Sequence, residues 1–307
     1  MQSAADNVYK YQYLILISIV FYRLNDCLSK VLTSDLGTFE ILFYRSLFTL
    51  ALIPLYLMFK KVNVSVFFEK YNMMRNVLAA VALFFEVASL EYLSLSTFIL
   101  LLYSVPIFIK IFARIILGES ISKVDIFVIS VSIFGQLFVF EGALENESIL
   151  GVVYALSGAV TYALSCIVTK KIKNPDSNSI YVSYVMVLFL ISLLKVPSTL
   201  PSQNEMFILF GMAVFHIAAF LLYLEGFLHL KASRAAVLEY SGLIFALIFD
   251  FAFWHNIPQP GEILGGAIIL VASLISIYRE KAQSVFHMIY EALRENAART
   301  KPQTDEK

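Results

Sequence analysis

The sequence predicts an all-α integral membrane protein with ten transmembrane helices, arranged as two inverted five-helix repeats. Three observations favour this fold class. Hydrophobic residues make up 59% of the 307 residues, and the mean hydropathy is +0.78. Soluble domains contain only about 45–50% apolar residues, so a bilayer is the natural solvent for this chain. Basic residues gather in alternate loops, and a stretch of the first half returns in the second.

Cutting the chain at its polar breaks gives ten apolar segments, each near the roughly 20 residues that a helix needs to cross a bilayer. The segments are 12–31, 37–59, 72–93, 94–117, 122–140, 149–171, 178–198, 204–228, 231–254 and 261–280. This division predicts a first repeat over 12–140 and a second over 149–280, joined by an external loop at 141–148. Residues 1–11 form a cytoplasmic N-terminus, and 281–307 form a cytoplasmic tail that is partly an amphipathic helix.

The clearest internal similarity relates Tyr103–Ser120 to a stretch that begins at Tyr240, at an offset of 137 residues. Tyr103 meets Tyr240 in this register, and the serine that follows each tyrosine is also matched. Because each repeat has an odd number of helices, the second copy enters the membrane from the opposite side. Inverted repeats are common in secondary transporters, where binding lies at the repeat interface and access alternates between the two sides. Chance similarity between apolar segments is the alternative.

The loops rich in Lys and Arg are alternate ones, which the positive-inside rule places on the cytoplasmic side. Their basic residues, together with one just inside the third segment, are Lys60, Lys61, Lys70, Arg75, Lys123, Lys170, Lys171, Lys173, Lys231, Arg234, Arg279 and Lys281. The opposite side carries few basic residues and the acidic loop 141–148. Both termini are therefore predicted to be cytoplasmic, in a bacterial inner membrane.

A series of motifs runs in a fixed order from the fourth segment into the fifth. It consists of Ser94 and Ser96, then Pro106, then Gly118 with Glu119, then Gly135. Arg45 adds a matching arginine in the second segment. In their order and spacing these residues resemble the EamA-type proteins of the drug/metabolite transporter superfamily. The resemblance covers about 12–280 and implies ten helices and the transport of a small solute.

The second copy departs from this pattern. Leu243 stands opposite Pro106, and His255 stands opposite Gly118, so two identical half-sites are not expected. The run from Leu238 to Leu270 resembles the branch of the superfamily that includes bacterial S-adenosylmethionine uptake carriers.

Charged residues inside the apolar segments are expected to face the interior of the bundle, because a charge at the bilayer centre costs about 2.5–3.5 kcal/mol or more. Four of them and one tyrosine lie at a similar depth: Arg23, Asp26, Arg45, Glu86 and Tyr103. The arginines would bind a carboxylate through paired N–H donors, and an acid would bind an ammonium group. An ion pair between Asp26 and Arg45 that only joins two helices is the alternative.

Four tyrosines lie inside the segments, where a hydroxyl needs a hydrogen-bond partner. They are Tyr22, Tyr103, Tyr223 and Tyr240. Beside the charges, such tyrosines could stack a purine ring or hold a cation against a ring face. Tyr103 and Tyr240, as repeat mates, are both assigned to the substrate site, with ordinary interhelical hydrogen bonding as the alternative.

Lys110 and Glu239 lie at similar distances from the cytoplasmic ends of two repeat-related segments. A pair between them would latch an inner gate in one state and part in the other, and a permanent buried pair is the alternative. Pro106 lies in the middle of segment 94–117. Because proline removes a helical hydrogen bond, it is predicted to be a hinge.

The sequence lacks the motifs of an ATP-driven pump, an enzyme or a metal centre. Cys27 and Cys166 both lie inside apolar segments, and the four histidines show no metal-ligand spacing. The net charge of zero gives no sign of a nucleic-acid partner. No cofactor is expected.

These features favour a secondary carrier that moves a small zwitterionic or cationic metabolite, of the amino-acid or S-adenosylmethionine type, by alternating access. Two other classes stay open. An efflux pump for hydrophobic compounds would not need the charges. The second class is a non-transporting scaffold, which would not need a polar interior, or a membrane-embedded enzyme, which should show clustered acid, base or metal ligands at a loop–membrane boundary. Coupling is open between a proton carried by Glu86 and exchange for a second solute. The direction of transport and the oligomeric state are also open.

Overall fold

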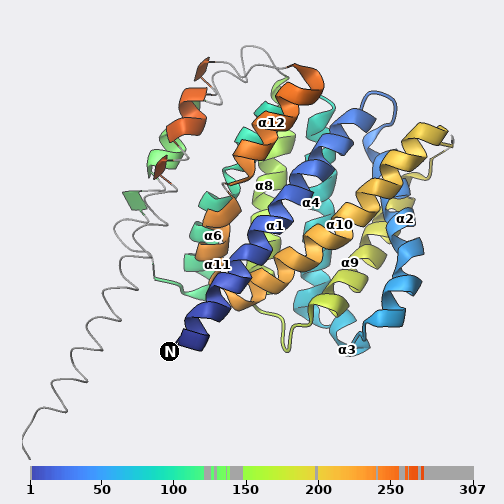
Figure 1. Cartoon of the computed structure of the whole chain (residues 1–307), viewed down its shortest axis with the longest axis horizontal. Helices are drawn as coiled ribbons and strands as arrows, with labels where there is room; N and C mark the ends of the chain where they lie inside the picture. Colours follow the sequence, from blue (N-terminus) through green and yellow to red (C-terminus); the bar gives the residue numbers. More distant parts are fainter. Residues whose placement is uncertain are drawn as a thin grey trace, which may run out of the picture.

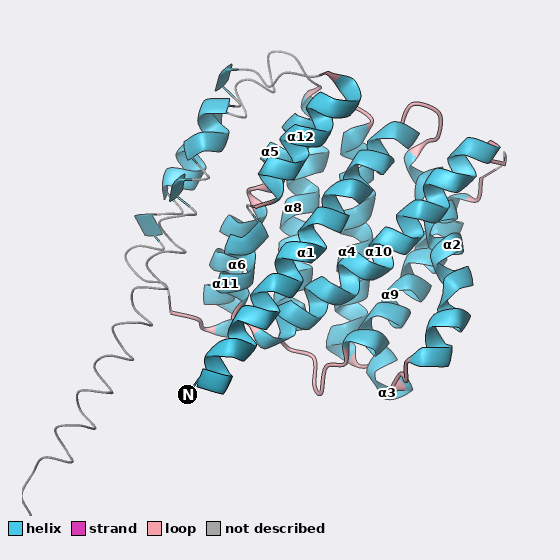
Figure 2. Cartoon of the chain, in the orientation of Figure 1, coloured by secondary structure: helices cyan, strands magenta, loops and turns pink. Residues whose placement is uncertain are grey.

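The computed structural model describes residues 2–120, 126–127, 130–135, 137–138, 148–197, 200–239, 241–255, 260–261, 263–268 and 271–272. This part of the chain forms helices and no strand, in agreement with the all-α prediction (Figure 2). In chain order the helices are α1 (Gln2–Leu32), α2 (Thr38–Phe59), α3 (Val64–Phe67), α4 (Lys70–Leu90), α5 (Leu95–Leu102), α6 (Val105–Phe112), η1 (Ala113–Leu117), α8 (Ile149–Thr169), α9 (Ser177–Ser192), η2 (Leu193–Lys195), α10 (Gln203–His229), α11 (Ala232–Glu239) and α12 (Gly242–Trp254).

Six helical segments among the described residues are long and apolar enough to cross a membrane. They are Thr38–Phe59, Lys70–Leu90, Thr97–Leu117, Ile149–Thr169, Ser177–Lys195 and Gln203–His229. α1 covers the predicted segment 12–31, but it begins at Gln2, so residues 2–11 continue this helix. α11 and α12 cover the predicted segment 231–254. Parts of 122–140 and 261–280, and all of the tail, lie outside the described residues.

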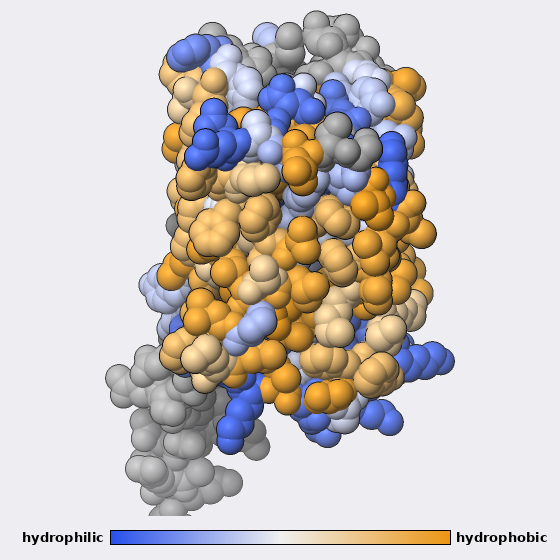
Figure 3. Space-filling view, turned by 90° about the vertical axis from the view of Figure 1, so that its right-hand side faces the viewer, coloured by the Kyte–Doolittle hydropathy of each residue, from blue (hydrophilic) through white to orange (hydrophobic). Residues whose placement is uncertain are grey.

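The outer surface carries a belt of apolar side chains. In Figure 3 these side chains cover the middle of the face, and hydrophilic residues gather at both ends. Large apolar groups such as Phe59 and Leu194 are 77% and 80% exposed, which water would disfavour and hydrocarbon would not. The belt and the six long helices are typical of a multi-pass membrane protein.

Side-chain caps mark where several helices begin. Glu69 accepts a hydrogen bond of 2.8 Å from the Asn72 backbone N–H at the start of α4. Ser202 and Glu205 form a capping box at the start of α10. Such caps satisfy backbone N–H groups that have no partner within the helix, so these starts follow from the local sequence.

The helix pairs with the most extensive contacts are α4 with α8 and α1 with α10 (Figure 1). α2 packs against α9. Glycines allow these helices to pack closely. A Cβ atom on Gly226 of α10 would lie 2.6 Å from Ile15 Cγ1 of α1, and one on Gly151 of α8 would lie 2.7 Å from Tyr92 Cβ. Small residues at helix interfaces permit this packing in membranes.

The helix breaks in the two matched stretches have the same hydrogen bonds. The Ser104 backbone N–H and hydroxyl donate to the Leu101 carbonyl at 3.0 and 2.8 Å. The Ser241 backbone N–H and hydroxyl donate to the Leu238 carbonyl at 3.1 and 2.8 Å. Both donor–acceptor pairs are related by the offset of 137 residues that was found in the sequence.

The position of Pro106 corrects the expectation of a mid-helix proline. The predicted segment 94–117 is divided into α5, a turn at Tyr103–Ser104, α6 and the π-helix η1. Pro106 is the second residue of α6, where a missing N–H costs no helical hydrogen bond. Ser241 makes the same break without a proline, so proline is not required for it.

A lysine at the end of α1 caps the C-terminal end of α4. Lys30 Nζ donates to the carbonyls of Leu90 and Leu93 at 2.8 and 2.7 Å. These carbonyls have lost their helical partners, and the positive charge also favours the negative end of the helix dipole.

Lys170, which follows α8, does the same for α10. Its Nζ donates to the carbonyls of Phe227 and Leu230, which lie 137 residues after the two carbonyls bound by Lys30. In Figure 1 α1 and α4 end at the upper side of the molecule, and α8 and α10 end at the lower side. The two lysine caps therefore lie at opposite ends of the bundle.

Lys170→Met is expected to destabilise the protein by about 1.5–3 kcal/mol, because it removes charge-assisted hydrogen bonds to carbonyls at the end of α10. Thermal unfolding in detergent would measure the loss. Lys171→Met is the matched control, since the Lys171 ammonium only lies 6.0 Å from the Tyr71 ring centroid. Equal melting temperatures for the two variants would contradict the capping role.

Candidate functional site

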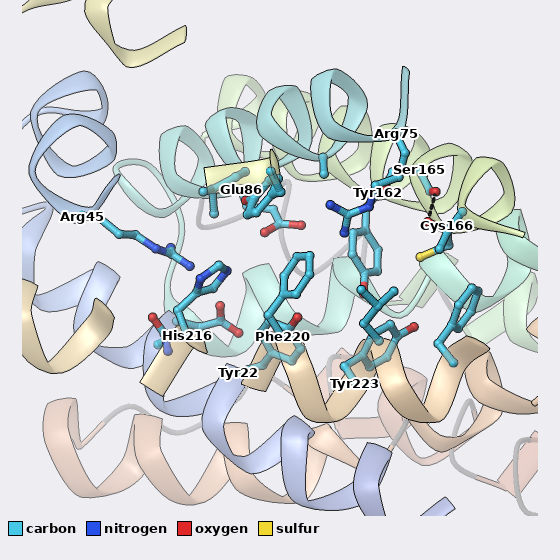
Figure 4. Close-up of a pocket in the computed structure, with 18 residues that line it drawn as sticks. Tyr22, Arg45, Arg75, Glu86, Tyr162, Ser165, Cys166, His216, Phe220 and Tyr223 are labelled. Atoms are coloured by element: carbon cyan, nitrogen blue, oxygen red, sulfur yellow. Dashed lines mark hydrogen bonds between the residues drawn. The ribbon is translucent and has the colours of Figure 1, made fainter. Parts of the chain in front are cut away.

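A polar cavity lies inside the bundle. One part lies between α1, α2, α4, α8, α9 and α10, and α5, α6 and α11 line the other part together with α1, α4, α8 and α10. Figure 4 shows labelled side chains of α1, α2, α4, α8 and α10 pointing toward one another. The cavity has two adjoining lobes, which share Tyr22, Asp26, Glu86, Tyr162 and Tyr223. The first lobe adds Arg45, Arg75, Ser165, Cys166, Tyr184, His216 and Phe220, among others. The second adds Ile19, Arg23, Leu102, Tyr103, Val105 and Glu239.

Two groups of residues in this cavity differ in charge. The acid-rich pole consists of Arg23, Asp26, Arg45, Glu86 and Glu239. The Arg75 pole consists of Arg75, Tyr162, Ser165, Cys166, Tyr184 and Phe220.

The acid-rich pole contains the four charged residues that the sequence placed at one depth. Arg23 Nη1 lies 2.9 Å from Asp26 Oδ2, and each side chain is 18% exposed. Asp26 thus pairs with Arg23 of its own helix, whereas the sequence suggested Arg45. Arg45 is 4% exposed, and its Nε has no hydrogen-bond partner among the described residues. Glu86 faces both guanidinium groups. α1, α2 and α4 therefore bring charges of both signs to one place.

Glu239 joins this pole from α11. It accepts a hydrogen bond from the Tyr223 hydroxyl of α10, and it lines the second lobe together with Tyr103. Lys110 is 6% exposed in α6, which packs against α11, but it lines neither lobe. The pair between Lys110 and Glu239 stays a prediction. Tyr240, the other tyrosine assigned to the site, lies outside the described residues.

Arg75 is the charged cavity residue that the sequence reasoning missed, because it was counted among the cytoplasmic basic residues. It is 6% exposed on α4. Its guanidinium lies 5.1 Å from the Tyr184 ring centroid and 4.7 Å from the Phe220 ring centroid. Nη1 donates to Asn76 Oδ1 at 3.2 Å, and Nε has no hydrogen-bond partner in the part of the chain that the structure describes.

The spacing along α4 could have revealed this position. Arg75, Ala79, Leu83 and Glu86 follow one another at intervals of four, four and three residues, which places them on one helical face. All four line the first lobe. Since Glu86 was assigned to the interior, the same face should have carried Arg75 inward.

Burial of Arg75 is costly. Moving one ion out of water costs several kcal/mol in proteins, and a desolvated cation–π contact returns about 2 kcal/mol. The aromatic rings alone do not offset that cost. A buried charge whose cost is not offset by its neighbours is typical of a functional residue.

Aromatic rings fill the space between the two poles. His216 is 4% exposed, and its ring centroid lies 5.7 Å from that of Phe220 and 5.9 Å from those of Tyr181 and Tyr184. These contacts pack the His216 ring among three other aromatic rings. Tyr22 of α1 lies beside His216, with its ring centroid 6.4 Å from that of His216 in an edge-to-face contact. The rings offer flat surfaces to a planar or cationic group.

Comparisons with known proteins agree with a membrane transporter. The sequence profile of the EamA-like transporter family matches residues 10–141 and again residues 149–278. An S-adenosylmethionine uptake transporter of Rickettsia conorii (strain ATCC VR-613 / Malish 7) is 26% identical over 276 residues, which is 87% of this chain and 92% of the relative. Pseudopaline exporter CntI of Pseudomonas aeruginosa (strain UCBPP-PA14) is 25% identical over 269 residues, which is 85% of this chain and 93% of the relative.

A solved crystal structure has the same fold. It superposes with a TM-score of 0.67 over 89% of this chain and 98% of its own, at 14% sequence identity. The curated relatives are named as transporters, and the family profile matches most of the chain in two successive stretches. The chain is therefore a membrane transporter that belongs to the EamA-like transporter family.

Proposed function

We propose that this protein is a secondary transporter that moves a small zwitterionic or cationic metabolite across a bacterial inner membrane by alternating access. The observation that carries the proposal is the buried cavity with charges of both signs and aromatic walls. A purely hydrophobic substrate would leave these charges without compensation, whereas a zwitterion supplies a partner for each sign. S-adenosylmethionine and amino acids are the substrate types of this kind, and one relative is named for S-adenosylmethionine uptake.

The proposed architecture is ten helices in two inverted repeats, 12–140 and 149–280, joined by the external loop 141–148. The two matches to the family profile support this division. The matched serine breaks and the matched lysine caps support it further. The helix contacts support it as well, because α1 and α4 of the first repeat pack on α10 and α8 of the second repeat. Rocking of the two repeats around the cavity would open it to either side in turn.

The proposed orientation has both termini in the cytoplasm, as the basic loops indicate. The Arg75 pole then lies toward the cytoplasm and the acid-rich pole toward the outside, because Arg75 is near the start of α4 and Glu86 near its end. Lys110 and Glu239 are proposed as gate residues, and Pro106 as part of a hinge at the break between α5 and α6. Coupling is proposed through a proton on Glu86 or through exchange for a second solute.

Counterflow in proteoliposomes tests the proposal. Wild-type protein is expected to exchange labelled S-adenosylmethionine or an amino acid across the vesicle membrane. Arg45→Gln is expected to lower the initial rate about tenfold or more, because it removes a charged donor from the acid-rich pole. Arg114→Gln is the matched control, since Arg114 is exposed in η1 and lies outside the cavity.

Two results would contradict the proposal. Failure of every zwitterion to move would exclude the substrate class. Wild-type transport rates in Arg45→Gln would instead agree with an efflux pump for hydrophobic compounds. Absence of transport of any solute by the wild-type protein would agree with a scaffold.

Export of a polar metabolite is the second candidate, because the pseudopaline exporter is about as similar to this chain as the uptake transporter. Uptake into right-side-out and inside-out vesicles separates the two directions. A pH gradient imposed on the same vesicles separates proton coupling from solute exchange.

A further inference from the structure

Arg75 is a buried cation with no described carboxylate beside it. The titratable groups that face it are Tyr184, Cys166, Tyr22, Tyr162 and His216. No carboxylate among the described residues lies within ion-pair distance of its guanidinium. The group therefore lacks a counter-ion in the part of the chain that surrounds it here.

The carboxyl groups of the cavity face cations other than Arg75. Each of the three acids in the acid-rich pole faces Arg23, and two of them also face Arg45. Glu239 also bonds to Tyr223 and faces Tyr162 and Cys166 of the Arg75 pole, but it is not within ion-pair distance of Arg75. Arg23 and Arg45 therefore have carboxyl groups that face them, whereas Arg75 has no carboxylate partner among the described residues.

Neighbouring side chains fix the Arg75 guanidinium and leave a hydrogen-bond donor for a ligand. The rings of Tyr184 and Phe220 lie within 5.1 Å of it, and Asn76 accepts from Nη1. Nε is buried and has no hydrogen-bond partner among the residues described. Figure 4 shows Arg75 and Arg45 pointing into the cavity from opposite sides. A planar anion could accept hydrogen bonds from such a fixed fork of N–H donors.

We propose that Arg75 binds the carboxylate of the transported molecule while the acid-rich pole binds its cationic group, so that the substrate is an elongated zwitterion. This assignment rests on the proposed function and specifies the class of substrate. A carboxylate fits the Arg75 pole because guanidinium and carboxylate pair through two parallel hydrogen bonds. Hydroxyl groups from Tyr162 and Ser165 line the same pole and can donate to the remaining oxygen lone pairs.

The separation of the poles sets the length of the substrate. Arg75 and Glu86 are on the same face of α4, and their Cα atoms are about 16 Å apart along the helix axis. In an α-amino acid with an uncharged side chain, a single carbon separates the only cation from the carboxylate, so such a molecule cannot reach both poles. A molecule with its cation several bonds from its carboxylate can bind both.

Competition in the counterflow assay tests this assignment with three probes. They are S-adenosylmethionine, its decarboxylated analogue and methionine. With wild-type protein, S-adenosylmethionine is expected to compete about tenfold better than the decarboxylated analogue, and methionine is expected to compete weakly. Arg75→Gln is expected to abolish the preference by weakening S-adenosylmethionine alone, and Arg75→Lys to restore part of it. Arg114→Gln is the control and should keep the wild-type preference.

Each other outcome overturns the assignment. A preference that survives in Arg75→Gln, or an equal loss for both probes, would give Arg75 a structural role. If Arg75→Gln does not fold, the wild-type comparison decides alone, and equal competition by the two probes is the negative result. If wild-type protein exchanges none of the probes, the proposed substrate class fails, and this assignment fails with it.

Discussion

Replacing Glu86 with glutamine is expected to slow transport of a zwitterionic or cationic substrate by about ten- to a hundredfold. Glu86 lines both lobes of the cavity, so a substrate in either lobe meets it. The change removes one negative charge and keeps the shape of the side chain. Charge-assisted hydrogen bonds contribute about 1.5–3 kcal/mol, which corresponds to that range of rates. Initial rates in proteoliposomes would measure the effect.

The control for Glu86→Gln is Asp35→Asn, which also removes one negative charge. Asp35 is exposed beyond the end of α1, where it accepts a hydrogen bond from the Ser34 hydroxyl. Asp35→Asn should therefore transport at the wild-type rate. A Glu86→Gln protein as active as Asp35→Asn would remove Glu86 from both substrate binding and proton coupling.

The second large effect is expected from Gly226→Ala, which should prevent α1 from packing closely on α10. The added Cβ would lie 2.6 Å from Ile15 Cγ1 and 2.7 Å from the Tyr11 carbonyl oxygen. Ile15 is 0% exposed, and a backbone oxygen cannot move away without shifting α1. Overpacking of this kind costs about 1–3 kcal/mol or more. A lower melting temperature in detergent, with less monodisperse protein on size-exclusion chromatography, is the expected result.

Gly211→Ala is a matched control on the same helix, because a Cβ atom added there would meet no atom of the described neighbouring residues within 4 Å. Alanine there should leave the stability unchanged or raise it by about 0.5–1 kcal/mol, as glycine is a poor helix former. If both alanine variants melt at the wild-type temperature, the contact between α1 and α10 is looser than the structure shows.

Much of the fold could be predicted from the sequence, because the free-energy cost of burying polar groups in a bilayer allows few backbone structures. Apolar segments of sufficient length must be helices there, since every backbone group has to find its partner within the segment. The same cost assigned Arg23, Asp26, Arg45 and Glu86 to the interior, and the structure places all four around one cavity. Their role in binding a substrate stays a prediction.

The tertiary structure decided which groups pair and where helices break. Periodicity along one helix cannot show that Tyr223, on another helix, takes Glu239 as its acceptor. The hydrophobic pattern also runs without interruption through the turn at Tyr103–Ser104, so only the packed structure shows Pro106 at the start of α6.

Arg75 shows the physical limit most clearly. By itself the sequence determined that this is a multi-helix membrane protein with a charged interior, because hydropathy depends on composition along the chain. An arginine one turn inside a helix can reach solvent or turn inward, and its cost in each place depends on neighbours from distant segments. Tyr184 of α9 and Phe220 of α10 supply those neighbours. Only the assembled helices therefore decided that a residue counted as a surface charge lies in the cavity.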